Sequence, residues 1–184
     1  MRKLLSVLLL LVVFLSGWMN FRMVRKLWTP TDHDLDAALS ESAELREFLP
    51  DIAIFPQQEG VSFTKVHHRG LFAHDCYLLR VEGDGNMEAA QRDVAARFTF
   101  LEGTQVDRFG YVTIPTPEFD IGSYHFRVVA AENPYPYTYP KYFGMIGVSE
   151  QEQTVLYLWY SDQDRDIIDD MAQFVTKEWQ LDLK

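Results

Sequence analysis

Hydrophobic and polar positions divide the chain into one long apolar run followed by shorter periodic segments. Residues 4–21 read LLSVLLLLVVFLSGWMNF, 18 consecutive positions without a charged side chain. As a helix this run would measure about 27 Å at about 1.5 Å per residue, close to the roughly 30 Å of the bilayer hydrocarbon core. Trp18 and the basic residues on both sides suit the headgroup region. We therefore predict an N-terminal transmembrane helix, with residues 1–28 as a membrane anchor that contacts the lipid bilayer through residues 4–21.

Two alternatives for this run are a cleaved secretory signal and a helix buried in a soluble domain. The basic start and the apolar stretch fit a signal, which also needs small residues before the cut. A cut after Gly17 places Leu15 at the −3 position, and a cut after Ser16 places Phe14 there. We therefore favour an uncleaved anchor of the signal-anchor type.

The expected membrane orientation depends on a small difference in the number of basic residues on the two sides of the apolar run. Two basic residues precede the run and three follow it closely, so the positive-inside rule barely discriminates between the two orientations. The signal-like start favours export. We expect a single-pass protein of the cell membrane whose C-terminal domain lies outside the cytoplasm.

The rest of the chain, residues 29–184, predicts a single α+β domain. Apolar residues spaced three or four positions apart predict about three helices, at 31–49, 87–101 and 162–180. Runs of β-like residues predict about six strands, at 61–68, 72–82, 111–114, 124–130, 142–148 and 154–160, with a further short strand at 52–55.

Connections and capping signals extend this prediction to the topology. The connections are short and hairpin-like, so we expect a largely antiparallel sheet with the helices packed on one face. The run TVLYLWY at 154–160 is apolar on both faces, which predicts the central strand. Residues 161–164 approximate a capping box, so the last helix should begin there and bury Ile167 and Ile168.

Charge separates this domain from nucleic-acid-binding proteins. The chain has 17 basic and 27 acidic residues, and five of the basic ones but none of the acidic ones lie in residues 1–30. The remaining domain is therefore acidic, with an excess of 15 negative charges. Binding to phosphates requires a basic surface, so we exclude a nucleic-acid partner. One cysteine, Cys76, excludes an internal disulfide.

Residues 67–76, HHRGLFAHDC, hold the densest candidate chemistry. With a turn at 70–71, His67 would face His74 across a hairpin, and Cys76 would follow on the face of His74. With a turn at 69–70, Lys65 would face His74 instead. His67, His74 and Cys76 are therefore weak candidates for metal ligands, and solvated histidines with a buried cysteine are the simpler interpretation. We expect no metal, no cofactor and no catalytic residue.

A tyrosine- and proline-rich segment at 133–143 is the most unusual in composition. Its prolines favour an extended polyproline conformation, on which rigid aromatic rings could contact a protein, a peptide or a glycan. The candidate binding residues are Tyr135, Tyr137, Tyr139 and Tyr142. Packing of these tyrosines against the edge of the core is the alternative.

The sequence thus favours a membrane-tethered, non-enzymatic binding or structural domain. Glycine-rich phosphate loops, G-x-S-x-G and H-E-x-x-H motifs are absent from the sequence, which argues against common nucleotide-binding proteins and hydrolases. The alternative is a membrane-anchored hydrolase or metalloenzyme that uses the region His67–Cys76.

Overall fold

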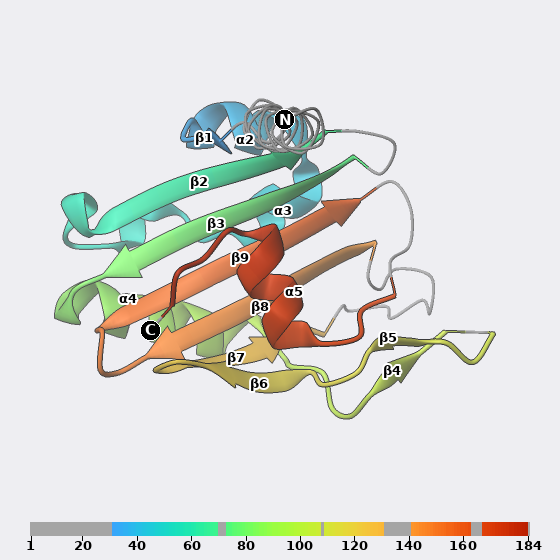
Figure 1. Cartoon of the computed structure of the whole chain (residues 1–184). Helices are drawn as coiled ribbons and strands as arrows, with labels where there is room; N and C mark the ends of the chain where they lie inside the picture. Colours follow the sequence, from blue (N-terminus) through green and yellow to red (C-terminus); the bar gives the residue numbers. More distant parts are fainter. Residues whose placement is uncertain (1–30, 70–72, 108, 131–140, 163–166, 184) are drawn as a thin grey trace, which may run out of the picture.

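The chain folds around one antiparallel sheet (Figure 1). The computed structural model describes residues 31–69, 73–107, 109–130, 141–162 and 167–183, and the predicted membrane anchor lies outside these ranges. Within them, seven strands pair in the order β1-β2-β3-β9-β8-β7-β6, and β4 and β5 form a separate two-stranded sheet. The α+β class and the antiparallel sheet are confirmed. No helix in these ranges is long and apolar enough to cross a membrane.

The strands of the main sheet are β1 (Thr31–Asp32), β2 (Val61–His68), β3 (His74–Glu82), β6 (Glu118–Ile121), β7 (Tyr124–Val128), β8 (Tyr142–Ser149) and β9 (Thr154–Asp162). The small sheet consists of β4 (Gln105–Val106) and β5 (Val112–Ile114). The α-helices are α2 (Leu35–Glu41), α3 (Ala43–Phe48), α4 (Asp84–Arg97) and α5 (Met171–Glu178). Two 3-10 helices span Ile52–Ile54 and Gln58–Gly60.

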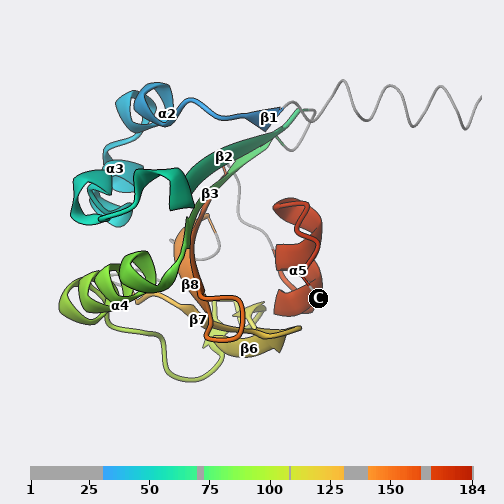
Figure 2. The same ribbon diagram turned by 90° about the vertical axis from the view of Figure 1, so that its left-hand side faces the viewer.

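Helices cover both faces of the sheet, and the prediction of a single covered face was wrong. Helices α2, α3 and α4 lie on one face and α5 lies on the other (Figure 2). β9 is the fourth of the seven strands, so its predicted central position is confirmed. Its side chains explain why both faces of the sheet are covered. Leu156, Leu158 and Tyr160 face the core under α5, whereas Val155 and Tyr157 face the core under the other helices. A strand that is apolar on both sides needs cover on both sides.

The predicted N-terminal helix over 31–49 is divided into α2 and α3. Ser42 adopts an extended conformation between them, and its hydroxyl accepts a hydrogen bond from the backbone N–H of Leu45, at 3.1 Å. Serine therefore starts a new helix where apolar periodicity alone predicted continuation. The start of the segment also differs, because Asp34 caps α2 and residues 31–32 pair with β2 as a short edge strand.

The last predicted helix begins later than its sequence pattern indicated. β9 continues to Asp162, and α5 starts at Met171, where Asp170 supplies the N-cap. Ile167, predicted to be buried, is 59% exposed, whereas Ile168 is buried. Pairing of β9 with β3 therefore includes Ser161 and Asp162, the first two of the residues that resembled a capping box, and residues 163–164 lie outside the described ranges.

Two smaller differences have local causes. The predicted strand at 52–55 is a 3-10 helix, because the Asp51 carboxylate accepts a hydrogen bond from Ala53 N and caps it. The predicted helix over 87–101 ends at Arg97, after which Phe100 bridges to Val129 in extended conformation. Backbone pairing with the sheet replaced the last helical turn.

Candidate functional site

Two strand ends meet the end of a helix on the α5 face of the sheet. β2 ends at His68 and β3 begins at His74, and these two residues pair directly across the hairpin. Cys76 lies two positions further along β3, on the same face, and is buried under α5. One ring nitrogen of each histidine and the Cys76 Sγ all lie within 4.8 Å of one another. We call these three residues the histidine–cysteine cluster.

Glu178, the last residue of α5, contacts both histidines. Its carboxylate oxygen Oε2 accepts a hydrogen bond from His74 Nε2 at 2.8 Å and lies 3.5 Å from His68 Nε2. Its backbone carbonyl accepts a hydrogen bond from His68 Nε2 at 2.8 Å. This bond satisfies one of the carbonyl groups that a helix leaves without a partner at its C-terminus. Beside it, Trp179 Nε1 donates to the carbonyl of Tyr77 at 2.8 Å, which also fixes this turn to β3.

The electrostatics of this contact favour an ionised Glu178 carboxylate and a neutral His68 imidazole. Burial by itself would raise the pKa of Glu178, but hydrogen bonds from His74 and Lys177 and the proximity of His68 lower this pKa to about 2. Burial lowers the pKa of His68, and nearby His74 lowers it further, which outweighs the hydrogen bond to the Glu178 carbonyl. The Glu178 side chain is only 7% exposed, so its negative charge depends on these partners rather than on water.

Aromatic and acidic side chains enclose the cluster on the sheet side. The imidazole rings of His68 and His74 are stacked, with centroids 4.2 Å apart and an interplanar angle of 17°. The ring of Tyr160 lies 5.4 Å from that of His74. Its hydroxyl donates to the buried carboxylate of Asp162 at 2.9 Å. These strand residues place polar atoms at the margin of an apolar core.

His67, predicted as the partner of His74, lies on the opposite face of the sheet. Its Nδ1 contacts Asp75, its neighbour across the hairpin. Both predicted registers were wrong, because β2 and β3 are joined through residues 69–73 rather than through a two-residue turn. On this opposite face, Lys65 forms an ion pair with Glu41 of α2 at 2.5 Å. His67 therefore belongs to a charged network beside α2, and His68 takes its place next to His74.

The donor atoms of the cluster define what it can bind. Two imidazole nitrogens and one thiol sulfur are ligands for Zn²⁺ and related transition-metal ions, whereas Ca²⁺ and Mg²⁺ prefer oxygen. Glu178 adds a carboxylate at the same place. Without an ion, the same contacts hold α5 against the sheet.

The predicted tyrosine surface is described only in part. Tyr135, Tyr137 and Tyr139 lie outside the described residues. Tyr142 begins β8 and is 37% exposed, with Lys141 Nζ 5.5 Å from its ring centroid.

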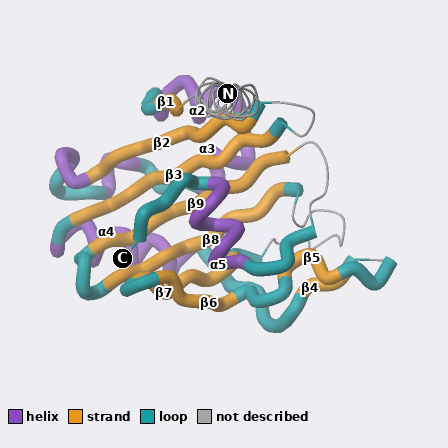
Figure 3. Tube along the Cα trace, in the orientation of Figure 1, coloured by secondary structure: helices purple, strands orange, loops and turns teal. Residues whose placement is uncertain are grey.

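A second exposed apolar surface, which the sequence analysis did not identify, lies on the β4–β5 hairpin. This hairpin extends beyond the main sheet at the end where β9 stops and β8 starts (Figures 1 and 3). Its exposed side chains include Phe109 (67%) and Tyr111 (58%), together with Val106 and Val112. Large apolar side chains gathered on a projecting hairpin are typical of a contact surface.

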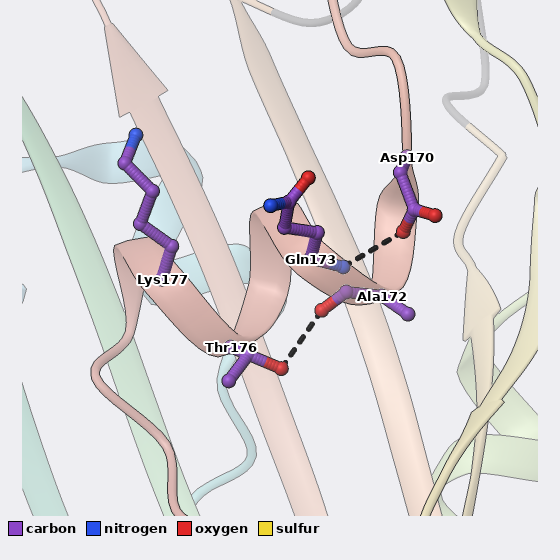
Figure 4. Close-up of a pocket in the computed structure, with 5 residues that line it drawn as sticks. All are labelled: Asp170, Ala172, Gln173, Thr176 and Lys177. Carbon is purple, nitrogen blue, oxygen red and sulfur yellow. Dashed lines mark hydrogen bonds between the residues drawn. The ribbon is translucent and has the colours of Figure 1, made fainter.

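The outer surface of α5 carries a shallow hollow without comparable chemistry (Figure 4). Asp170 accepts a hydrogen bond from the backbone N–H of Gln173 at 2.8 Å, and Thr176 Oγ1 donates to the carbonyl of Ala172 at 2.8 Å. Both hydrogen bonds belong to the helix itself. We therefore place the candidate site on the inner side of α5, not here.

Glu178 and His68 are the site residues that the sequence analysis missed. Glu178 occupies the apolar stripe of the last helix, since it follows Phe174 by four positions and Val175 by three. A carboxylate at a core-facing position is a usable signal, because a buried charge requires a partner. His68 had no such signal, since its pairing with His74 depends on the length of the hairpin connection.

Known proteins offer no guide to this site. Comparisons with family models, with curated proteins and with solved structures found no match to this chain.

Proposed function

We propose that this protein is a membrane-tethered, non-enzymatic domain that binds a partner outside the cytoplasm. The observation that carries the proposal is the run of 18 uncharged residues at 4–21, placed directly before an acidic folded domain. Such a run has the length and apolarity of a membrane-spanning helix. A tether of this kind confines a domain to the bilayer surface and raises its effective concentration there.

The start of the folded domain supports a close tether. Thr31 already pairs with Val66 in the sheet, so at most residues 22–30 separate the apolar run from the fold. Nine residues span no more than about 32 Å when fully extended. The domain would therefore stay within a few nanometres of the membrane.

The exposed hairpin of β4 and β5 supports binding to another protein. Phe109 and Tyr111 are the most exposed of its large apolar side chains. Aromatic residues are enriched in the central parts of protein interfaces. Tyr142, at the start of β8, is a further exposed aromatic residue.

Charge substitutions within the apolar run test the tether in the full chain. We expect the native chain to remain with membranes after alkaline washing and to be degraded by protease added to intact cells. Leu9→Arg with Val12→Arg should release it, because each arginine at the centre of a span costs about 2.5–3.5 kcal/mol. Leu9→Val with Val12→Leu is the matched control and should behave as the native chain. Release of the native chain by the wash, or a mature chain beginning after residue 17, would contradict the proposal.

A photo-crosslinking residue placed at position 109 tests the binding surface. Crosslinks to one protein species at 109, but not at Glu150 in the exposed β8–β9 turn, would support binding through the hairpin. Equal crosslinking at both positions would argue against it.

The alternative, a membrane-anchored hydrolase or metalloenzyme, depends on the histidine–cysteine cluster. This alternative is favoured only if the cluster holds a metal ion with one coordination position open to a substrate.

A further inference from the structure

We propose that His68, His74 and Cys76 bind one Zn²⁺ ion, with Glu178 orienting the two imidazoles. This inference is independent of the proposed tether and partner. It rests on the convergence of three ligand atoms from two strands, all within 4.8 Å of one another. A tetrahedral zinc site with bonds of about 2.0–2.3 Å holds its ligand atoms somewhat closer together than this.

The types of donor atom select the ion. One thiolate and two imidazoles form the mixed sulfur–nitrogen set that Zn²⁺ accepts in proteins. Three protein ligands leave a fourth coordination position, which water would fill; the burial of Cys76 and of both histidines under α5 suits a structural ion rather than one open to a substrate. Ions that prefer oxygen would find only the carboxylate and carbonyl oxygens of Glu178 in this group.

The hydrogen bonds around the histidines match those of metal sites. A histidine that binds an ion through one nitrogen commonly donates its other N–H to a carboxylate or a backbone carbonyl. Glu178 supplies both kinds of acceptor, its carboxylate to His74 and its carbonyl to His68. This pattern is an observation separate from the ligand distances, and it points to the same two rings.

Burial limits the access of water to the charged groups of the site. Cys76 is fully buried, and the two histidine side chains are mostly covered. A bound cation would offset the negative charges of Glu178 and of the Cys76 thiolate in a region of reduced water access.

The stacked rings require one adjustment. A ligating lone pair lies in the plane of its imidazole, and the planes of His68 and His74 differ by only 17°. One ring must therefore turn out of the stack for both to meet the ion. We expect this rotation to change the surroundings of Tyr160, whose ring contacts that of His74.

Cobalt titration of the full chain in detergent, without a histidine tag, tests the proposal. We expect one equivalent of Co²⁺ to produce thiolate-to-metal charge-transfer absorption together with the visible bands of a tetrahedral site, and Zn²⁺ to abolish both. Cys76→Ser should remove the charge-transfer absorption, and His68→Ala should weaken Co²⁺ binding at least tenfold. His67→Ala, one position away but on the opposite face, is the matched control and should leave binding unchanged.

A measurement on the native chain tests the proposal even if the substituted variants fail to fold. Because Cys76 is the single cysteine, X-ray absorption of the zinc-loaded chain should report one thiolate sulfur and at least two nitrogen or oxygen ligands. A zinc environment without sulfur, no cobalt spectrum in the native chain, or equal losses in His67→Ala and His68→Ala would overturn the proposal.

Discussion

The two faces of the sheet are covered in different ways. On one face, three helices pack through apolar and aromatic side chains, with Phe48 of α3 in contact with the rings of Phe98 and Trp159. On the other, α5 is the one α-helix among the described residues, and its last turn rests on histidines and a buried carboxylate. Both covers contact the same central strand, β9.

Both faces contribute a buried apolar core, but the histidine–cysteine cluster lies on one of them. The face under α2, α3 and α4 combines close apolar packing, which tolerates little change of volume, with hydrogen bonds such as those from Arg97 to the Phe48 carbonyl and from the Tyr157 hydroxyl to the Ala90 carbonyl. The α5 face combines an apolar core with ionisable groups whose pKa values depend on where the helix end lies. We therefore expect substitutions of buried apolar side chains to lower the free energy of unfolding most on either face, and substitutions of Glu178 and the histidines to affect mainly local structure and ligands.

The largest effect is expected from Phe48→Ala. Removing this buried ring should lower the free energy of unfolding by about 3–5 kcal/mol, since it leaves a cavity between α3 and the sheet. Gly144→Ala should cost about 1–3 kcal/mol, because its Cβ would lie 2.7 and 2.8 Å from Phe48 Cδ2 and Cζ and closer still to Cε2. Urea unfolding of the full chain in detergent measures both.

A double substitution tests whether this contact is the cause. In the Phe48→Ala background, Gly144→Ala should cost almost nothing, because the ring that it would meet is gone. Additive losses would show that Gly144 is required for its backbone conformation rather than for the approach of Phe48.

On the α5 face, Glu178→Ala should cost about 1–3 kcal/mol. The substitution leaves the Nε2–H of His74 without its carboxylate acceptor at a mostly buried position. Lys177→Ala is the matched control: this lysine pairs with the other carboxylate oxygen but is 65% exposed, so its loss should change stability little. Equal losses in the two variants would assign the effect to the helix rather than to the buried hydrogen bond.

Most of the long strands of the sheet were predictable from the sequence. Alternation and apolar runs located β2, β3, β7, β8 and β9, because these strands are long and fully or half buried. The central position of β9 followed from its two apolar faces. The short strands β1, β4 and β6 were not predicted, since two to four residues carry too little periodic pattern.

The candidate site was less predictable because it depends on distant pairings. Cys76 and His74 were placed on one face correctly, since alternation along a strand is local. The choice between His67 and His68 required the register of the hairpin, where one residue reverses the face. Glu178 lies 104 positions from His74, and only the packing of α5 brings the two together.

The N-cap of α5 offers a smaller test of how that helix is held. Asp170→Ala should lower stability by about 1 kcal/mol, because the carboxylate accepts a hydrogen bond from Gln173 N. Asp34→Ala, which removes the corresponding cap of α2, is the comparison. Hydrogen exchange followed by mass spectrometry should show faster exchange across α5 in the first variant and across α2 in the second. Unchanged exchange in α5 would mean that Glu178 and Trp179 hold it without the cap.

The smallest effect on stability is expected at Tyr142, at the edge of the face that α2, α3 and α4 cover. Tyr142, Ser161, Asp75 and His67 form one row across the strands on that face, and none of them is buried. The adjacent row on the α5 face, with Tyr160 and Cys76, is fully buried. Tyr142→Ala should therefore change the free energy of unfolding by less than about 0.5 kcal/mol, as is usual for surface positions. A loss above about 2 kcal/mol, in the range of buried large residues, would place this ring in the core and remove it from the candidate binding surface.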